Sequence, residues 1–206
     1  MLQHIGLTGS EKLDALAVCQ RGNWLYADLV EGCAICCPDI RRNGMLGAVA
    51  GDIIGSVYEF HPAMSMDFPL LSEGSAWTDD TVLTMVVAEA LQKGRPYEET
   101  LREFALEHPD AGFGGRFRQW FTTPGSKPYN SFGNGSAMRV SPVGWAFDTL
   151  EETLEEAQRS ADVTDNHPEG IKGAQSVVAA IFVTRQGGTQ TDIRDAFQGK
   201  YVVPRS

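Results

Sequence analysis

An all-α fold is predicted for this chain, and two observations carry the prediction. Several segments place apolar side chains at the 3.6-residue spacing of an amphipathic helix, and long stretches of alternating apolar and polar residues, typical of strands, are missing. Hydrophobic residues make up 42% of the 206 residues, which is enough to fill the core of a compact helical bundle. We expect this bundle in residues 43–206, and in residues 1–42 an N-terminal extension without a clear period.

The first predicted helix lies in the stretch GMLGAVAGDIIGSVYEF, where Gly47, Gly51 and Gly55 recur every four residues. A glycine costs a helix about 1 kcal/mol relative to alanine. Three glycines on one face therefore indicate that another backbone or a ligand approaches there. Asp52 and Glu59 are seven residues apart, so they point the same way if the helix continues.

The second predicted helix lies in the stretch WTDDTVLTMVVAEAL and ends at Gly94 and Pro96. Thr149 and Glu152 have the spacing of a capping box, so a further helix should begin there. Other helices are predicted in YEETLREFALEH, IKGAQSVVAAIFVTRQ and TDIRDAFQ, with long loops at residues 60–77 and 109–142.

The net charge of −10 argues against nucleic acid as a partner, because contact with phosphate backbones needs basic patches. An acidic chain can still bind a cation, or a small phosphorylated ligand held by backbone amides. No apolar run approaches the roughly 20 residues that span a bilayer. The first residues also lack the basic and apolar segments of a secretory signal. We therefore expect a cytoplasmic protein without a membrane partner.

All four cysteines lie near the start of the chain, at Cys19, Cys33, Cys36 and Cys37. A Cys-x-x-Cys pair is half of a zinc site, but the second pair is missing and no histidine follows at finger spacing. We therefore prefer reduced, partly buried thiols as the interpretation.

Asp79 and Asp80 stand side by side between Thr78 and Thr81, directly before the second predicted helix. One interpretation is a helix N-cap followed by first-turn acids, which the positive end of the helix favours by up to about 1 kcal/mol. The other is a metal site, since carboxylate and hydroxyl oxygens are the ligands that Mg²⁺ or Mn²⁺ selects. Spacing alone leaves both interpretations open.

The stretch NSFGNGSAMRVSPVGW, residues 130–145, is rich in glycine and short polar side chains. Gly133 and Gly135 permit positive φ, so we predict an anion-binding nest of backbone amides, with Phe132 as a stacking face. The alternative is a structural turn. His167 lies just before another predicted helix, where a lone histidine is more often a cap or a surface residue than a ligand.

Four motifs follow one another in the chain: GAVAGDIIGSVYE, WTDDT, FGNGSAMRVSPVG and NHPEGIKGA. Each alone is weak, but the ordered set, over about residues 43–187, resembles the ADP-ribosylglycohydrolase family. This family includes the dinitrogenase reductase-activating glycohydrolases of bacteria and the ADP-ribosylhydrolases of animals. The resemblance implies an all-α fold with a cleft that holds two Mg²⁺ or Mn²⁺ ions.

The resemblance also implies roles for individual residues. By the family pattern, Thr78, Asp79 and Asp80 are metal ligands, and Glu59 is a metal-contacting and gating residue. Glu59, Asp79 and Asp80 are thereby the predicted catalytic residues. The predicted ADP-ribose contacts are Gly114, Gly115, Ser131, Phe132, Gly133, Asn134 and His167.

The implied activity is metal-dependent hydrolysis of the C1″ bond that joins ADP-ribose to a modified protein or, as an ester, to a small molecule. Metal ions would hold the ribose hydroxyls and lower the pKa of the attacking water. Two alternatives stay open. One is a catalytically weak or inactive module that binds ADP-ribose, and the other is a different magnesium-dependent hydrolase of phosphorylated metabolites.

Family members carry a second acidic motif, Asp-x-Asp-Thr, near the C-terminus, where this chain has only TQTDIRD with Asp192 and Asp195. We therefore expect a bundle that is incomplete at its C-terminus and a weak second metal site, since metal affinity follows ligand number and charge. The apolar surface left open would be covered by residues 1–42 or by a second copy of the chain. A homodimer is thus one of two expected arrangements.

Overall fold

The computed structural model describes residues 40–198, and every regular element in that range is a helix, which confirms the predicted all-α fold. The longer helices are α3 (Ile40–Gly55), α4 (Asp79–Lys93), α5 (Tyr97–Glu107), α9 (Leu150–Ala161) and α10 (Pro168–Arg185). The shorter ones are η2 (Ser56–Tyr58), α6 (Gly115–Thr122), α7 (Gly135–Arg139), α8 (Ser141–Ala146) and α11 (Gln190–Gln198). The four cysteines and residues 1–39 of the predicted extension lie outside the described residues, and the domain boundary stays a prediction.

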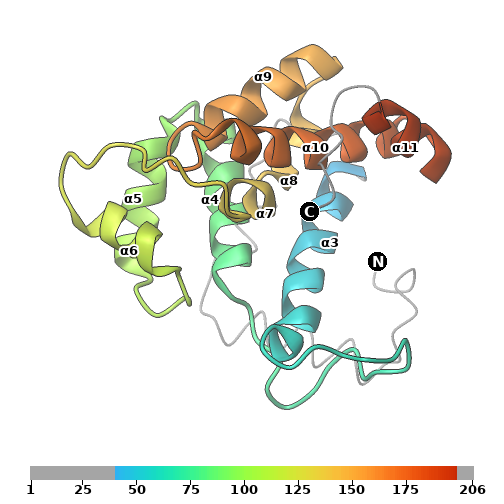
Figure 1. Cartoon of the computed structure of the whole chain (residues 1–206), viewed down its shortest axis with the longest axis horizontal. Coiled ribbons are helices and arrows are strands. Elements are labelled where there is room, and N and C mark those ends of the chain that lie inside the picture. The colour runs from blue at the N-terminus through green and yellow to red at the C-terminus, as the bar shows by residue number, and fades with distance from the viewer. Residues whose placement is uncertain (1–39, 199–206) are drawn as a thin grey trace.

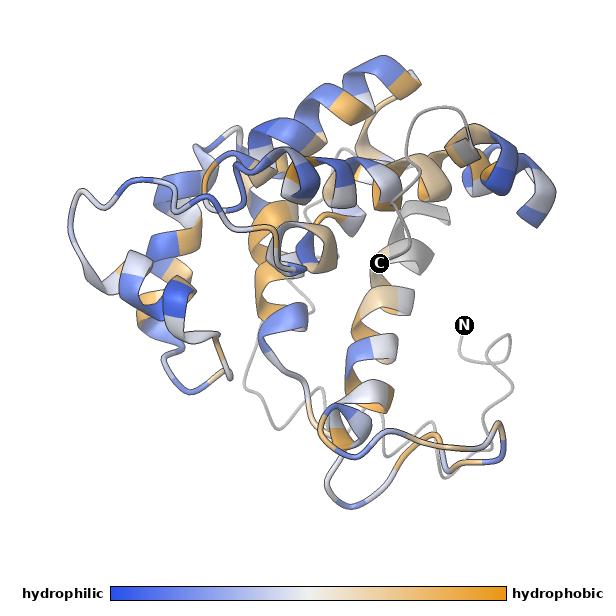
Figure 2. Ribbon diagram, in the orientation of Figure 1, coloured by the Kyte–Doolittle hydropathy of each residue, from blue (hydrophilic) through white to orange (hydrophobic). Residues whose placement is uncertain are grey.

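Helix α4 is the centre of the fold, because it packs against α3, α5, α7 and α8. Its neighbouring residues Val86 and Val87 belong to two different core clusters. The first cluster joins α4 to α5 and α6, and the second joins α4 to α8, α9 and α10. Figure 2 shows α4 as a largely hydrophobic ribbon with a hydrophilic first turn, whereas the outer face of α9 is hydrophilic. The polar start of α4 therefore lies at the end of a buried helix.

The predicted loop at residues 109–142 is wrong in part, because it contains α6, α7 and the first residues of α8. Helix α6 buries Phe117, Trp120 and Phe121, which have the i, i+3, i+4 spacing of one helix face. The ring of Trp120 also lies 3.9 Å from the guanidinium carbon of Arg102 on α5. These contacts anchor α6, and with it the glycines that precede the helix. Residues 60–77 contain no helix, as predicted.

The glycine row on α3 does not meet the predicted neighbour among the described residues. Gly47, Gly51 and Gly55 are all exposed. A Cβ atom added to any of them would meet nothing within 4 Å. The opposite side of α3 packs on α4 and α8, with Ile53 buried. Within residues 40–198, no helix is long and apolar enough to cross a membrane.

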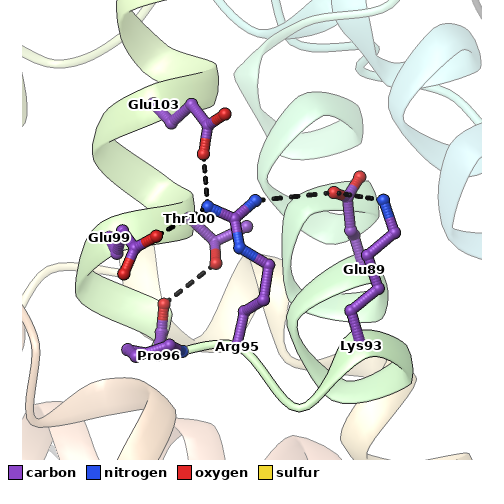
Figure 3. Close-up of polar contacts among 7 residues, drawn as sticks. All are labelled: Glu89, Lys93, Arg95, Pro96, Glu99, Thr100 and Glu103. Carbon is purple, nitrogen blue, oxygen red and sulfur yellow. Dashed lines mark hydrogen bonds and ion pairs between the residues drawn. The ribbon is translucent and has the colours of Figure 1, made fainter.

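The corner between α4 and α5 is held by charged side chains around Arg95, as Figure 3 shows. Gly94 ends α4 in the left-handed conformation. Arg95 then pairs with Glu99 at 2.9 Å and Glu103 at 2.5 Å on α5, and with Glu89 of α4 at 3.7 Å. The exposed pairs with Glu99 and Glu103 each contribute at most about 1 kcal/mol, and the pair with the buried Glu89 joins the end of α4 to the same guanidinium.

Candidate functional site

The start of α4 is a capped helix N-terminus, so the N-cap interpretation of the acidic doublet is confirmed. Thr78 has an extended backbone, and its hydroxyl oxygen accepts a hydrogen bond from the amide of Asp80 at 3.3 Å. Asp79 and Asp80 occupy the first turn. This arrangement satisfies the helix end, but it places two carboxylates within one turn of each other.

Asp52 of α3 is the main contact of this helix end, and it was not among the predicted site residues. One carboxylate oxygen accepts from the amide of Thr78 at 2.8 Å, and the other oxygen of the same group accepts from the Thr78 hydroxyl at 2.6 Å. The amide and hydroxyl of Thr81 also donate to Asp52, at 3.2 and 2.5 Å. Asp52 therefore joins α3 to α4 through four hydrogen bonds. Both threonines that flank the doublet thus donate hydrogen bonds to the Asp52 carboxylate.

Asp79 and Asp80 are left in an unfavourable electrostatic environment. Burial raises the pKa of Asp79 to about 6, and the charges of Asp80, Glu59 and Asp52 act in the same direction. Burial also raises the pKa of Asp80, with Asp52 and Glu59 as further causes. None of the ion pairs among the described residues involves these carboxylates. Two adjacent ionised carboxylates without a paired cation favour a bound one.

The donor chemistry of this helix end fits a hard cation, but the described side chains do not complete its coordination. Within residues 45–197, no three His, Cys, Asp or Glu side chains are grouped as one metal would need. The predicted ligands Glu59, Thr78, Asp79 and Asp80 do share one neighbourhood, as the pKa effects of Glu59 on both aspartates indicate. Their assignment as metal ligands and catalytic residues stays a prediction.

The second half of the candidate site begins beside Asp79 and continues to α6. Gly112 has φ +92°, and a Cβ atom added there would lie 3.9 Å from Oδ1 of Asp79. Gly114 is the N-cap of α6 and Gly115 is its first residue. The structure thus brings the segment that contains two predicted ADP-ribose contacts next to the acidic doublet.

Residues 130–135, the glycine loop, lie against residues 164–170, the loop template. The amide of Asn130 donates to Oδ1 of Asn166 at 2.8 Å. The rings of Phe132 and His167 have their centroids 5.3 Å apart. The predicted contacts Ser131, Phe132 and Gly133 are therefore brought together with His167, and Phe132 remains 70% exposed, so its ring is accessible for stacking.

Gly133 and Gly135 do not use the positive φ that glycine permits, and in this loop Asn130 takes that conformation, with φ +52°. Both glycines lie close to neighbouring side chains, and the approach is tighter at Gly135. A Cβ atom at Gly133 would lie 3.4 Å from Oγ of Ser131, which accepts from the Gly133 amide at 3.1 Å. One at Gly135 would lie 3.3 Å from the carboxylate of Asp165. A side chain at Gly135 would therefore press on Asp165, whereas one at Gly133 would make an ordinary contact.

His167 and Asn134 have structural positions at helix starts. Nδ1 of His167 accepts from the amide of Glu169 at 3.1 Å, which makes His167 the N-cap of α10. Asn134 is the N-cap residue of α7 without a side-chain cap. The capping interpretation of His167 is thus confirmed. A role in ligand binding stays a prediction for both residues.

Asp192 and Asp195 do not form the second acidic motif. Asp192, in the first turn of α11, accepts from the amide and the hydroxyl of Thr189 at 2.7 and 2.6 Å, and its own amide donates to the Thr189 hydroxyl, so the two residues form a capping box. These hydrogen bonds lower the pKa of Asp192. Asp195 pairs with Arg194 at 3.3 Å, and both side chains are exposed. The described contacts of these two carboxylates do not place either of them at the acidic end of α4.

Comparison with known proteins agrees with the family resemblance of the sequence motifs. The family model for ADP-ribosylglycohydrolases matches residues 39–202. The chain is 27% identical to the ADP-ribosylhydrolase ARH3 of Mus musculus, over 73% of this chain and 50% of that protein. It is 27% identical to ARH3 of Xenopus tropicalis and 26% identical to ARH3 of Homo sapiens, over 71% and 73% of this chain. The chain spans about half the length of the curated relatives it matches.

Proposed function

Because the chain belongs to the ADP-ribosylglycohydrolase family, we propose that it binds ADP-ribose and releases it from a modified protein or a small-molecule ester by metal-dependent hydrolysis. The relatives are named ADP-ribosylhydrolases. The observation that carries the proposal is the pair of desolvated aspartates at the start of α4, next to a glycine-rich segment and with no cation paired to them among the described residues.

Each part of the chain has a role in this proposal. The carboxylates of Asp79 and Asp80, with Glu59 and the Thr78 hydroxyl, would hold Mg²⁺ or Mn²⁺. The bound cation would supply a water of lowered pKa and a contact for the ribose hydroxyls. Asp52 keeps the two aspartates in place, because its four hydrogen bonds fix the backbone on both sides of them.

The glycine loop is proposed to bind the ADP-ribose moiety. Its compact backbone lets a ligand approach closely, and the exposed ring of Phe132 offers a face for stacking. Gly114 and Gly115 would add amides from the N-terminus of α6, which favours negative charge. A cytoplasmic location and a homodimer also stay proposals.

A second candidate function is an ADP-ribose-binding module with little or no turnover. One observation favours it: Asp192 takes part in the capping box of α11, and none of its described contacts reaches the acidic end of α4. Family membership argues against the remaining alternative, an unrelated magnesium-dependent hydrolase of phosphorylated metabolites.

Two measurements on the 206-residue chain separate these functions. Calorimetric titration with ADP-ribose tests binding, and incubation with an ADP-ribosylated peptide in Mg²⁺ or in EDTA tests release of free ADP-ribose. Binding together with Mg²⁺-dependent release supports the hydrolase. Binding without release in either condition supports the binding module. Absence of both binding and release would refute the proposal for this chain.

A further inference from the structure

The loop template, residues 164–170, contacts the glycine loop along its whole length. Asn166 bonds the amide of Asn130 at one end, and His167 contacts Phe132 in the middle. The carboxylate of Asp165 lies against Gly135 at the other end. Apart from His167, no residue of this segment is given a role in the proposed function. The segment nevertheless decides where the glycine loop lies.

Gly170 lies too close to backbone atoms of both segments for a side chain. A Cβ atom at this position would lie 2.8 Å from the carbonyl oxygen of Ser131 and 2.7 Å from that of Asp165. Both are backbone atoms, so neither can move away without shifting its segment. Ser136, the residue that follows the loop, also contacts Gly170, because its hydroxyl donates to the Gly170 carbonyl oxygen at 3.1 Å. Only glycine lets α10 support the loop at this distance.

A buried polar network holds Asp165 in place. Its side chain is 2% exposed, and Oδ2 accepts from the Thr164 hydroxyl at 2.7 Å. The fully buried Arg139, on the helix that follows the loop, donates to the Thr164 hydroxyl at 2.9 Å and lies 3.8 Å from the same carboxylate oxygen. A second Arg139 bond reaches the carbonyl of Ser160 at 2.8 Å. A shift of Asp165 would therefore take its charged partner away from a buried arginine.

The network reaches both ends of the loop. Asp165 lies near Tyr129, the residue before the loop, because its charge acts on the Tyr129 hydroxyl, and its carboxylate lies against Gly135 at the end of the loop. Burial raises the pKa of Tyr129 to about 12, and Asp165 acts in the same direction, so the phenol stays protonated. Neighbouring residues of the loop template thus contact both ends of the six-residue loop, Asn166 at Asn130 and Asp165 at Gly135.

We propose that Asp165 and Gly170 are positioning residues for the glycine loop: they set the loop in its ligand-binding conformation without contacting the ligand themselves. This inference rests on the proposed ADP-ribose site, and it adds residues that act on affinity through the loop alone. A displacement of the loop by about 1 Å is enough to weaken binding on the order of tenfold or more.

The test compares three glycine-to-alanine variants of the full chain. In Gly170→Ala the new methyl group meets the loop backbone. Gly173→Ala lies one turn further along α10, where the added Cβ would be 3.8 Å from Ala137, an ordinary contact. Gly144→Ala also clashes, at 2.8 Å, but with the Ile181 side chain rather than with the loop. The last two variants control for helix propensity and for a general loss of stability.

Two readouts are needed. Calorimetry gives the dissociation constant for ADP-ribose, and amide hydrogen exchange followed by NMR gives the protection of Asn130 and Gly133 in the ligand-free chain. We expect Gly170→Ala to weaken binding about tenfold or more and to speed exchange at both amides. Gly173→Ala and Gly144→Ala should leave both readouts within about twofold of the parent chain.

A further variant covers the case in which Gly170→Ala does not fold. Asn166→Ala removes only an exposed side chain, so the chain should fold, and the Asn130 amide should exchange faster with weaker ADP-ribose binding. Unchanged exchange at the loop in both Gly170→Ala and Asn166→Ala would overturn the inference. If the parent chain does not bind ADP-ribose, the proposed function fails, while the exchange readout still decides whether the template positions the loop.

Discussion

The acidic end of α4 and the glycine loop are stabilised in different ways. At the acidic end, Asp52 is fully engaged, but Asp79 and Asp80 are partly desolvated, close to other carboxylates, and raised in pKa. The glycine loop lies on a loop template whose buried charges, Arg139 and Asp165, are paired. We propose a division of labour from this difference: a bound cation would stabilise the first region, and the second would hold the ligand without one.

The largest effect is expected for Asp52→Ala. This change removes four hydrogen bonds to a carboxylate and the only described side-chain link between α3 and the start of α4. We expect the free energy of unfolding to fall by about 3 kcal/mol, measured by urea denaturation. Asp67→Ala, in the exposed segment after α3, is the control and should change it by less than about 0.5 kcal/mol. Equal stability of the two variants would show that Asp52 is not the link described.

Phe132→Ala should separate binding from stability. The ring is 70% exposed, so its removal should change the thermal midpoint little. If bases or sugars stack on it, ADP-ribose affinity should fall by about 1–3 kcal/mol in binding free energy, measured by calorimetry. Phe60→Ala is a matched control, because Phe60 is also highly exposed but lies outside the glycine loop. Equal affinity in the two variants would remove Phe132 from the binding site.

A smaller effect is expected for Asp79→Asn, and it depends on pH. The pKa of Asp79 rises from an unfolded value of 3.8 to about 6, so folding favours the protonated carboxyl. The associated stability is present below pH 3.8 and is lost as the pH rises through 6. Allowing for solvent screening, Asn at this position should stabilise the metal-free chain by about 1 kcal/mol at pH 7.5.

Thermal unfolding in EDTA at pH 7.5 and pH 4 measures this effect. The gain should be present at pH 7.5 and much smaller at pH 4, where the parent carboxyl is mostly protonated in the folded state. Added Mg²⁺ should reverse the order by stabilising the parent chain more than the variant. A variant that is less stable than the parent chain in EDTA at pH 7.5 would contradict the view that the doublet is electrostatically unfavourable without a cation.

The sequence predicts the long helices well, because their apolar spacing is local information. It also predicts the caps at Thr78 and Thr149, where the capping side chain lies within three residues of its partner. The predicted loop that proved to contain α6 shows the limit. The glycines near Phe117 and Trp120 favoured a loop in the prediction. The helical spacing of these aromatic residues is explained by their packing against α5.

The candidate site is predicted less completely, because its contacts join residues far apart in the chain. Asp52 reaches Thr78 across 26 residues, and Asn166 reaches Asn130 across 36. The only local signal for Asp52 was its seven-residue spacing from Glu59, and Asp165 gave none. Gly133 and Gly135 do not take positive φ, and Gly133 stays a predicted ADP-ribose contact.

The division of labour is tested most directly by titrating ADP-ribose into the parent chain and into the double variant Asp79→Asn, Asp80→Asn, each with Mg²⁺ and with EDTA. The account predicts that the parent chain binds in EDTA and binds more tightly in Mg²⁺. The double variant should retain the affinity measured in EDTA and lose the gain from Mg²⁺. Loss of all binding in the double variant, with the helical fold intact by circular dichroism, would contradict the account. The acidic end of α4 would then be needed for ADP-ribose binding even without a metal ion.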